Sequence, residues 1–135
     1  MTAPQTDSSD KKVSGQARQF VHLHTHSHYS LLEALPQIND LVAAAKADGQ
    51  DALALTDNGN LYAAVEFYKA CKKKEIKPIL GVDAYVAPRT RFDKEHRIDD
   101  QTSRLVLLAM NDTGYRNLLK LVSISYIEGF YYRPR

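Results

Sequence analysis

The chain has 135 residues, of which 44% are hydrophobic and 25% charged, and its formal net charge is +2. That length allows one domain or a piece of a larger one, and so small a charge does not by itself imply nucleic-acid binding. The single cysteine, Cys71, excludes an internal disulfide. Because no apolar run reaches ~20 residues and no secretory signal opens the chain, we expect a cytoplasmic protein without a membrane span.

The first residues differ in composition from the rest of the chain. Residues 1–18 are polar and almost free of large apolar side chains. Such a segment cannot bury enough surface to offset the entropy of ordering, so we predict a disordered leader. Residues 19–135 are then the structured part.

From Phe20 onward, strand and helix patterns alternate along the chain. A period-two pattern predicts a strand at 20–26, and apolar runs predict strands at 52–56, 77–87 and 105–110. The period-3.6 pattern predicts helices with apolar stripes at 38–45, 61–68 and 115–122. Gly49 is the expected end of the first helix, and Asp112 or Thr113 the expected cap of the third. Residues 89–102 are polar and charged, which predicts a surface loop. Alternating strands and helices predict a parallel α/β sheet with right-handed crossovers.

The first predicted strand carries histidines at every second position, namely His22, His24, His26 and His28. Alternation places them on one face, where imidazoles two residues apart can converge on one metal ion, whereas the outer two lie ~20 Å apart. Catalytic groups collect at the C-terminal ends of parallel strands, which favours His24 and His26. A solvated strand face with hydrogen-bonded histidines is the alternative. An affinity tag is disfavoured by the Leu, Thr and Ser spacers.

Polar residues also follow the next strands. Asp57 and Asn58 come directly after the second strand, Asp83 lies within the third, and Glu33 follows the first by a few residues. Asp57 taken alone is more typical of a turn or helix cap than of a metal site. Asp83, between Val82 and Ala84 in a buried strand, needs a partner. A metal ion, or a histidine that binds one, would supply it.

At this point the chain resembles a known family, the alpha subunit of bacterial DNA polymerase III. The resemblance runs almost unbroken over 20–135 and is carried by four segments: FVHLHTHSHYSLL, ALALTDNGNLYAAVEFY, KPILGVDAYVAP and LVLLAMNDTGYRNLLKLV. It implies that residues 19–135 are the N-terminal half of a distorted (β/α)7 barrel, the PHP (polymerase and histidinol phosphatase) domain. The polymerase palm, fingers and thumb would follow it.

The resemblance also implies which residues correspond to metal ligands. His24 and His26 match the paired histidines of active members, and Glu33 stands where an aspartate is usual. Asn58 and Arg104 replace histidines, and Asp83 replaces a glutamate. Asparagine coordinates transition metals poorly, and a guanidinium does not coordinate them. We therefore expect a partial or vestigial zinc, manganese or iron site, with Asp57 behind the ligands.

The implied role of this segment is structural, with no catalytic or cofactor-binding residue of its own. The domain would serve as a scaffold and as a docking surface for the proofreading exonuclease and other replisome subunits. The parent polymerase would bind DNA and use magnesium elsewhere in its chain. A metal-dependent phosphoesterase of the histidinol-phosphatase type is the alternative, although GNLYAAVEFY and NDTGYRNLL match the polymerase branch more closely. A plain structural α/β domain, whose histidines have no role, is the third hypothesis.

Overall fold

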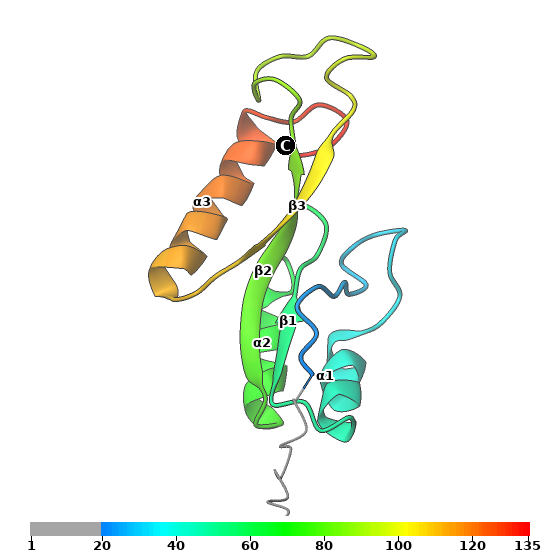
Figure 1. The fold of residues 1–135 in the computed structure, drawn as a ribbon, viewed down its shortest axis with the longest axis vertical. Coiled ribbons are helices and arrows are strands. Elements are labelled where there is room, and N and C mark those ends of the chain that lie inside the picture. Colours follow the sequence, from blue (N-terminus) through cyan, green and yellow to red (C-terminus); the bar gives the residue numbers. More distant parts are fainter. Residues whose placement is uncertain (1–19) are drawn as a thin grey trace, which may run out of the picture.

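A computed structural model describes residues 20–135 (Figure 1). The predicted leader, residues 1–18, lies outside the described residues. Three helices and three strands follow one another in the order α1 (Ile38–Ala47), β1 (Ala52–Leu55), α2 (Ala64–Lys73), β2 (Lys77–Val86), β3 (Ser103–Leu108) and α3 (Asp112–Ile127). No helix in this described part is long and apolar enough to cross a membrane.

The strands form one sheet in the order β1-β2-β3. β1 pairs with the first half of β2 in parallel, as predicted. β3 pairs with the second half of β2 in the antiparallel direction, from Gly81↔Leu108 to Val86↔Ser103, so the prediction of an all-parallel sheet is wrong here. A parallel return needs a crossover, usually a helix, and the described segment 87–102 contains none. Its polar residues offer no apolar stripe from which a crossover helix could be built.

The predicted first strand is an extended segment rather than a strand. It runs beside β1, whose Ala54 amide donates to the carbonyl of His22 at 2.9 Å, and the Thr56 amide donates to the carbonyl of Thr25 at 2.8 Å. These two acceptors are three residues apart, so the regular two-residue ladder is broken between them. The hydroxyls of Thr25 and Thr56 bond to the neighbouring segment instead.

The main core lies between α1, α2 and the sheet. α1 buries Ile38, Val42 and Ala45, and it ends at Asp48 before Gly49, whose φ of +74° suits a residue without a Cβ. α2 buries the face that carries Ala64, Phe67 and Cys71. Cys71 is thus a packed thiol, and burial raises its pKa to about 11.

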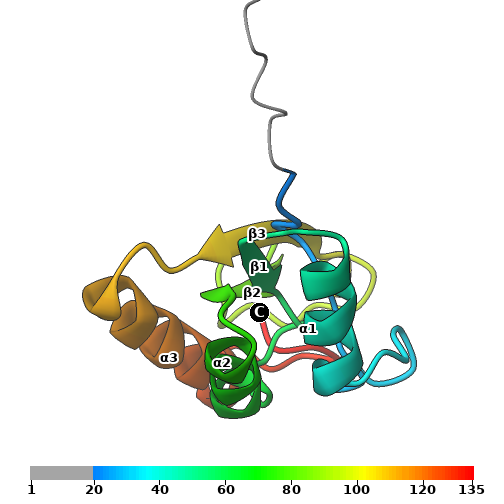
Figure 2. The same ribbon diagram turned by 90° about the horizontal axis from the view of Figure 1, so that it is seen from below.

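The buried face of α2 differs from the predicted one. The stripe through residues 61, 64, 65 and 68 was expected inside, yet Val65 is 61% exposed and Tyr68 47% exposed. Phe67 and Cys71 form the buried face of α2 instead, because their spacing directs both side chains toward α1 and β1. Figure 2 shows α2 and α3 on the same side of the sheet. The exposed residues of α2 therefore remain on the outer surface of that layer.

The N-cap of α3 lies one residue before the first of the two predicted caps. The side chain of Asn111 accepts a hydrogen bond from the Gly114 amide at 3.0 Å, so Asn111 caps the helix and the expected Asp112 or Thr113 does not. Leu118 is the one buried residue on α3.

Candidate metal centre

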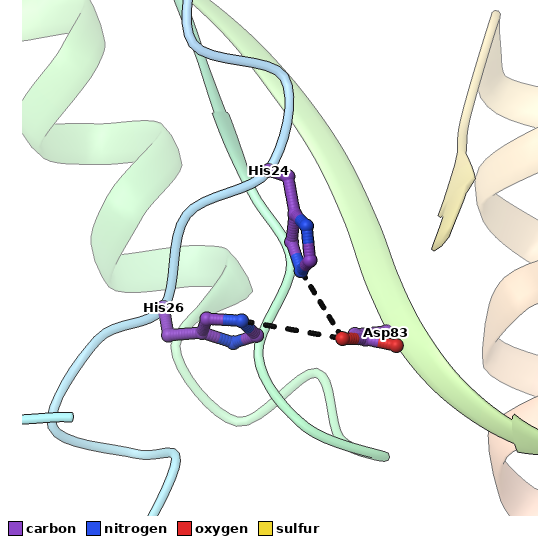
Figure 3. A group of neighbouring side chains, drawn as sticks. All are labelled: His24, His26 and Asp83. Atoms are coloured by element: carbon purple, nitrogen blue, oxygen red, sulfur yellow. Dashed lines mark hydrogen bonds and ion pairs between the residues drawn. The ribbon is translucent and has the colours of Figure 1, made fainter. Parts of the chain in front are cut away.

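His24 and His26 lie on the extended segment beside β1 and point toward Asp83 on β2 (Figure 3). The Nε2 atom of His24 is 3.1 Å from Oδ2 of Asp83, and the Nε2 atom of His26 is 4.0 Å from the same oxygen. One ligand atom from each residue lies within 4.8 Å of the others. The structure thus brings together three of the four predicted ligands. Two imidazole nitrogens and a carboxylate oxygen suit zinc, manganese or iron.

The backbone beyond the end of β1 places Asp83 at this point. The Asp83 amide donates to the carbonyl of Asp57 at 3.1 Å, and the Gly59 amide donates to the carbonyl of Asp83 at 2.8 Å. Asn58 and Asp83 form an isolated parallel bridge. The pairing of β1 with β2 therefore continues past Leu55, and it aligns the Asp57–Asn58 pair with Asp83.

Asp57 anchors the turn that follows the two histidines. Its carboxylate is 2% exposed and accepts from the Ser27 amide at 2.6 Å, the Ser27 hydroxyl at 2.8 Å and the Ser30 hydroxyl at 2.7 Å. The Ser30 oxygen also lies 3.5 Å from Nδ1 of His26. Asp57 therefore lies behind the histidine pair and fixes the direction of its loop, rather than capping a helix.

Arg104 covers the remaining side of Asp83. It projects from β3, and its Nε and Nη2 atoms donate to Oδ1 and Oδ2 of Asp83 at 3.0 and 2.6 Å. The same Nη2 atom also donates to the side-chain oxygen of Asn58. The guanidinium stacks 4.5 Å from the centre of the Tyr85 ring. Both carboxylate oxygens of Asp83 are thus engaged by a fixed positive charge.

Glu33 lies at the edge of this cluster. Its Oε2 atom accepts from the Asn58 side-chain amide at 2.5 Å and is 3.9 Å from Nη1 of Arg104. Glu33 is outside the group of three whose ligand atoms converge. The two substituted positions, Asn58 and Arg104, therefore link Glu33 to Asp83 through hydrogen bonds.

The charges in the cluster affect one another. Burial would raise the pKa of Asp83, but the hydrogen bonds and charge of Arg104, together with His24, hold it below its ordinary value. Burial, followed by repulsion from His24, lowers the pKa of His26, which keeps this imidazole in the neutral form that can bind a metal. Hydrogen bonding to Asp83 raises the pKa of Arg104.

The outer histidines lie outside the cluster, as their spacing predicted. The His22 ring packs edge-on against Phe20, with centroids 4.7 Å apart, and the His28 ring packs 4.3 Å from that of Tyr29. Sequence reasoning missed Ser27 and Ser30. Their only signal was their place directly after the histidines, and nothing in the sequence paired them with Asp57.

Comparisons with known proteins place the chain among described relatives. Residues 22–135 match the family model described as "PHP domain". The chain is 52% identical over 117 residues to DNA polymerase III subunit alpha of Borreliella burgdorferi and 54% identical over 117 residues to that of Treponema pallidum, covering 86% of this chain in each case. It spans about a tenth of the length of these curated relatives, 10% of each.

A solved structure shares the fold. An amidohydrolase from Chromobacterium violaceum matches with a TM-score of 0.52 and 22% identity, over 75% of this chain and 32% of the other. This likeness and the family match support the predicted α/β fold of a partial PHP barrel. The sequence match over 22–135 and the shared fold lead to one conclusion: the chain belongs to the PHP domain family.

Proposed function

We propose that the chain is the N-terminal PHP segment of a bacterial replicative DNA polymerase III alpha subunit, a DNA-directed DNA polymerase of chromosome replication. The observation that carries this proposal is the 52–54% identity to two alpha subunits over 117 residues. Nucleotidyl transfer, with its magnesium and its DNA contacts, belongs to other parts of that polymerase. The parent enzyme is proposed to act in the cytoplasm as part of a replisome.

We further propose that the PHP site is degenerate. His24, His26 and Asp83 would hold a zinc, manganese or iron ion, with Glu33 as an outer ligand and Asp57 behind them. Such an ion would supply an activated water for phosphodiester hydrolysis. Arg104 opposes metal binding, because its guanidinium donates to both carboxylate oxygens of Asp83. A metal ion would have to displace this guanidinium from the carboxylate. A divalent ion beside this fixed charge would also be repelled.

The proposed role of the domain is that of a scaffold and a docking surface for the proofreading exonuclease subunit and other replisome subunits. Its support is the loop beside the site, where Leu31, Leu32 and Leu35 are 77%, 106% and 90% exposed. Clustered exposed apolar side chains are typical of surfaces that another protein element covers. A helix or loop of a partner could bury these leucines without disturbing the histidines.

A metal-dependent phosphoesterase of the histidinol-phosphatase type is the second candidate. It is favoured by the convergence of His24, His26 and Asp83, whose ligand atoms lie within 4.8 Å of one another. The two candidates differ in the gene, because a polymerase requires a continuation of many hundred residues. Sequencing downstream of the codon for Arg135 separates them.

The ligand assignment is tested by restoring the substituted positions in the complete domain. The triple variant Asn58→His, Asp83→Glu, Arg104→His should bind severalfold more zinc, manganese or iron than the parent, measured by plasma mass spectrometry after dialysis. Phosphoesterase activity on a phosphodiester should be assayed in parallel. Arg89→His is the matched control, because it makes the same charge change at an arginine–aspartate pair outside the site. A triple variant with no more metal than the parent would show that these ligand positions are wrongly assigned.

A further inference from the structure

The outer face of α2 carries an aromatic and basic stripe. Val65, Tyr68, Lys69 and Lys72 are spaced i, i+3, i+4 and i+7, so they share one face of the helix, opposite the buried Phe67 and Cys71. All four side chains are exposed. The Lys72 ammonium lies 5.5 Å above the Tyr68 ring. An aromatic ring and two cations are therefore presented to solvent together.

Positive charge is concentrated where this stripe ends. Residues 69–77 contain five lysines and one glutamate, a net charge of +4, whereas the other residues of the chain sum to −2. The five lysines, Lys69, Lys72, Lys73, Lys74 and Lys77, are all exposed. The helix dipole accounts for the two in the last turn of α2, Lys72 and Lys73, but not for the other three.

These lysines are also free of ion pairs. Every ion pair found within residues 20–135 uses an arginine or a histidine as its cation, and none uses a lysine. Three arginines of the described residues, Arg89, Arg91 and Arg104, are paired with carboxylates of the chain itself. The lysines of 69–77 remain available to an external anion.

A groove lies beside the stripe, between α2 and the start of α3. Its volume is about 520 Å³, and its lining includes Val65, Tyr68, Lys69, Pro78, Met110 and Tyr115. Met110 is 92% exposed. One acidic residue, Asp112, lies on the opposite wall. The groove therefore combines two tyrosines and several apolar side chains with one lysine, Lys69, on its α2 wall. Its size is typical of ligand clefts, ~300–1,000 Å³.

We propose that this surface, the α2 face with its groove, binds single-stranded nucleic acid. Exposed aromatic rings stack on unpaired bases of any sequence, while lysines neutralise the adjacent phosphates. The five lysines and Tyr68 match both halves of such a ligand. An acidic peptide would use the lysines but would gain little from the ring, and a duplex keeps its bases stacked within itself. The inference rests on α2 and does not depend on the state of the metal centre.

The spacing of the lysines sets the expected number of contacts. Lys69 and Lys73 are separated by about 6 Å along the helix axis, and Lys77 opens the adjacent strand. About three phosphates could be neutralised together, so the logarithm of the affinity should fall with the logarithm of salt concentration with a slope of about −2.

The test is fluorescence anisotropy of a labelled oligothymidylate with the 135-residue chain, across a series of salt concentrations. The variant Lys69→Gln, Lys72→Gln, Lys73→Gln should lose at least about tenfold in affinity at low salt and most of the salt slope. The matched control, Lys46→Gln, Lys94→Gln, Lys120→Gln, removes the same charge at three exposed lysines elsewhere and should lose far less. Circular dichroism melts of both variants serve as the control that each is folded.

The role of the aromatic ring is tested separately. Tyr68→Leu should weaken oligothymidylate binding about fivefold or more, since one stacked base is lost, whereas Tyr68→Phe should bind like the parent. Polyglutamate of similar charge should compete poorly. Equal losses in the two triple-lysine variants, an unaffected Tyr68→Leu variant, or equal affinity for polyglutamate would each overturn the proposal.

Discussion

Two arginine–aspartate pairs in this fold have similar chemistry and different surroundings. Arg104 donates to both oxygens of Asp83 at the candidate metal centre, and Arg89 donates to both oxygens of Asp99 in the segment between β2 and β3. Asp83 is 3% exposed and Asp99 is 0% exposed. The two pairs differ in the further group that contacts the aspartate carboxylate. Asp83 also meets the imidazole of His24, whereas Asp99 accepts from the backbone amide of Glu95 at 2.8 Å.

The Asp99 pair is part of a clamp that joins two distant segments. Arg135 is 6% exposed, and its guanidinium donates to the carbonyls of Asp99 at 2.7 Å, Gly129 at 3.1 Å and Asp93. The loop before β3 and the residues after α3 are thereby fixed to each other. Arg89, Asp99 and Arg135 are thus held by partners within the chain itself. The comparison shows that a buried aspartate with an arginine becomes a candidate metal site only where spare nitrogen ligands converge on it.

The largest effect is expected from Asp99→Asn, which breaks the clamp. An asparagine amide would direct N–H donors toward Arg89 or the Glu95 amide, which are donors themselves. We expect the melting temperature to fall by roughly 5–10 °C, measured by circular dichroism. Asp83→Asn should cost less, because His24 can accept from the new amide. A smaller loss at Asp99 than at Asp83 would contradict the assignment of the clamp as the structural pair.

The Asp99→Asn variant should also change how the free energy of unfolding depends on pH in acid. Hydrogen bonds from Arg89 are the main cause that lowers the pKa of Asp99 from 3.8 to about 2. A depressed folded-state pKa contributes stability that is complete above the unfolded value and is lost as pH falls from about 4 to about 2. Urea unfolding over this range should therefore be less pH-dependent in Asp99→Asn than in the parent.

The second largest effect is expected on metal affinity, which should distinguish Arg104 from Arg89. Arg104→Gln removes a fixed charge from the carboxylate of Asp83 and should raise zinc or manganese affinity by at least about tenfold, or ~1.4 kcal/mol, in calorimetric titrations. Arg89→Gln makes the same charge change and should leave metal affinity unchanged while it lowers the melting temperature. If both variants gain affinity equally, general charge rather than the position of Arg104 would be responsible.

Local patterns predicted the parts of the fold that depend on local contacts. The spacing of residues 38, 42 and 45 predicted the buried face of α1, and the apolar run that starts at residue 77 predicted β2. The direction of β3 was mispredicted, since it depends on the route of the connection before it. The bond between Arg135 and Asp99 links residues 36 positions apart and leaves no local pattern.

The candidate site was predictable to the extent that its residues form local patterns or correspond to ligands of the similar family. Spacing singled out His24 and His26, Asp83 was expected to need a partner, and the family resemblance joined the three as ligands; the structure brings them within reach of one ion. The contact between Arg104 and Asp83 was not expected, because in an antiparallel pair Arg104 lies opposite Tyr85 and reaches Asp83 diagonally. This diagonal contact between Arg104 and Asp83 requires β3 to run antiparallel to β2.

The smallest effect is expected at Glu33. Its side chain is 48% exposed and 3.9 Å from Arg104, so Glu33→Gln should change the free energy of unfolding by less than about 0.5 kcal/mol in urea titrations. In the Arg104→Gln background, the same change should lower metal affinity only about threefold. The Asn58 amide competes for the carboxylate and keeps it at the edge of the site. A loss as large as that caused by His26→Gln would make Glu33 a full ligand, and no loss would remove it from the ligand set.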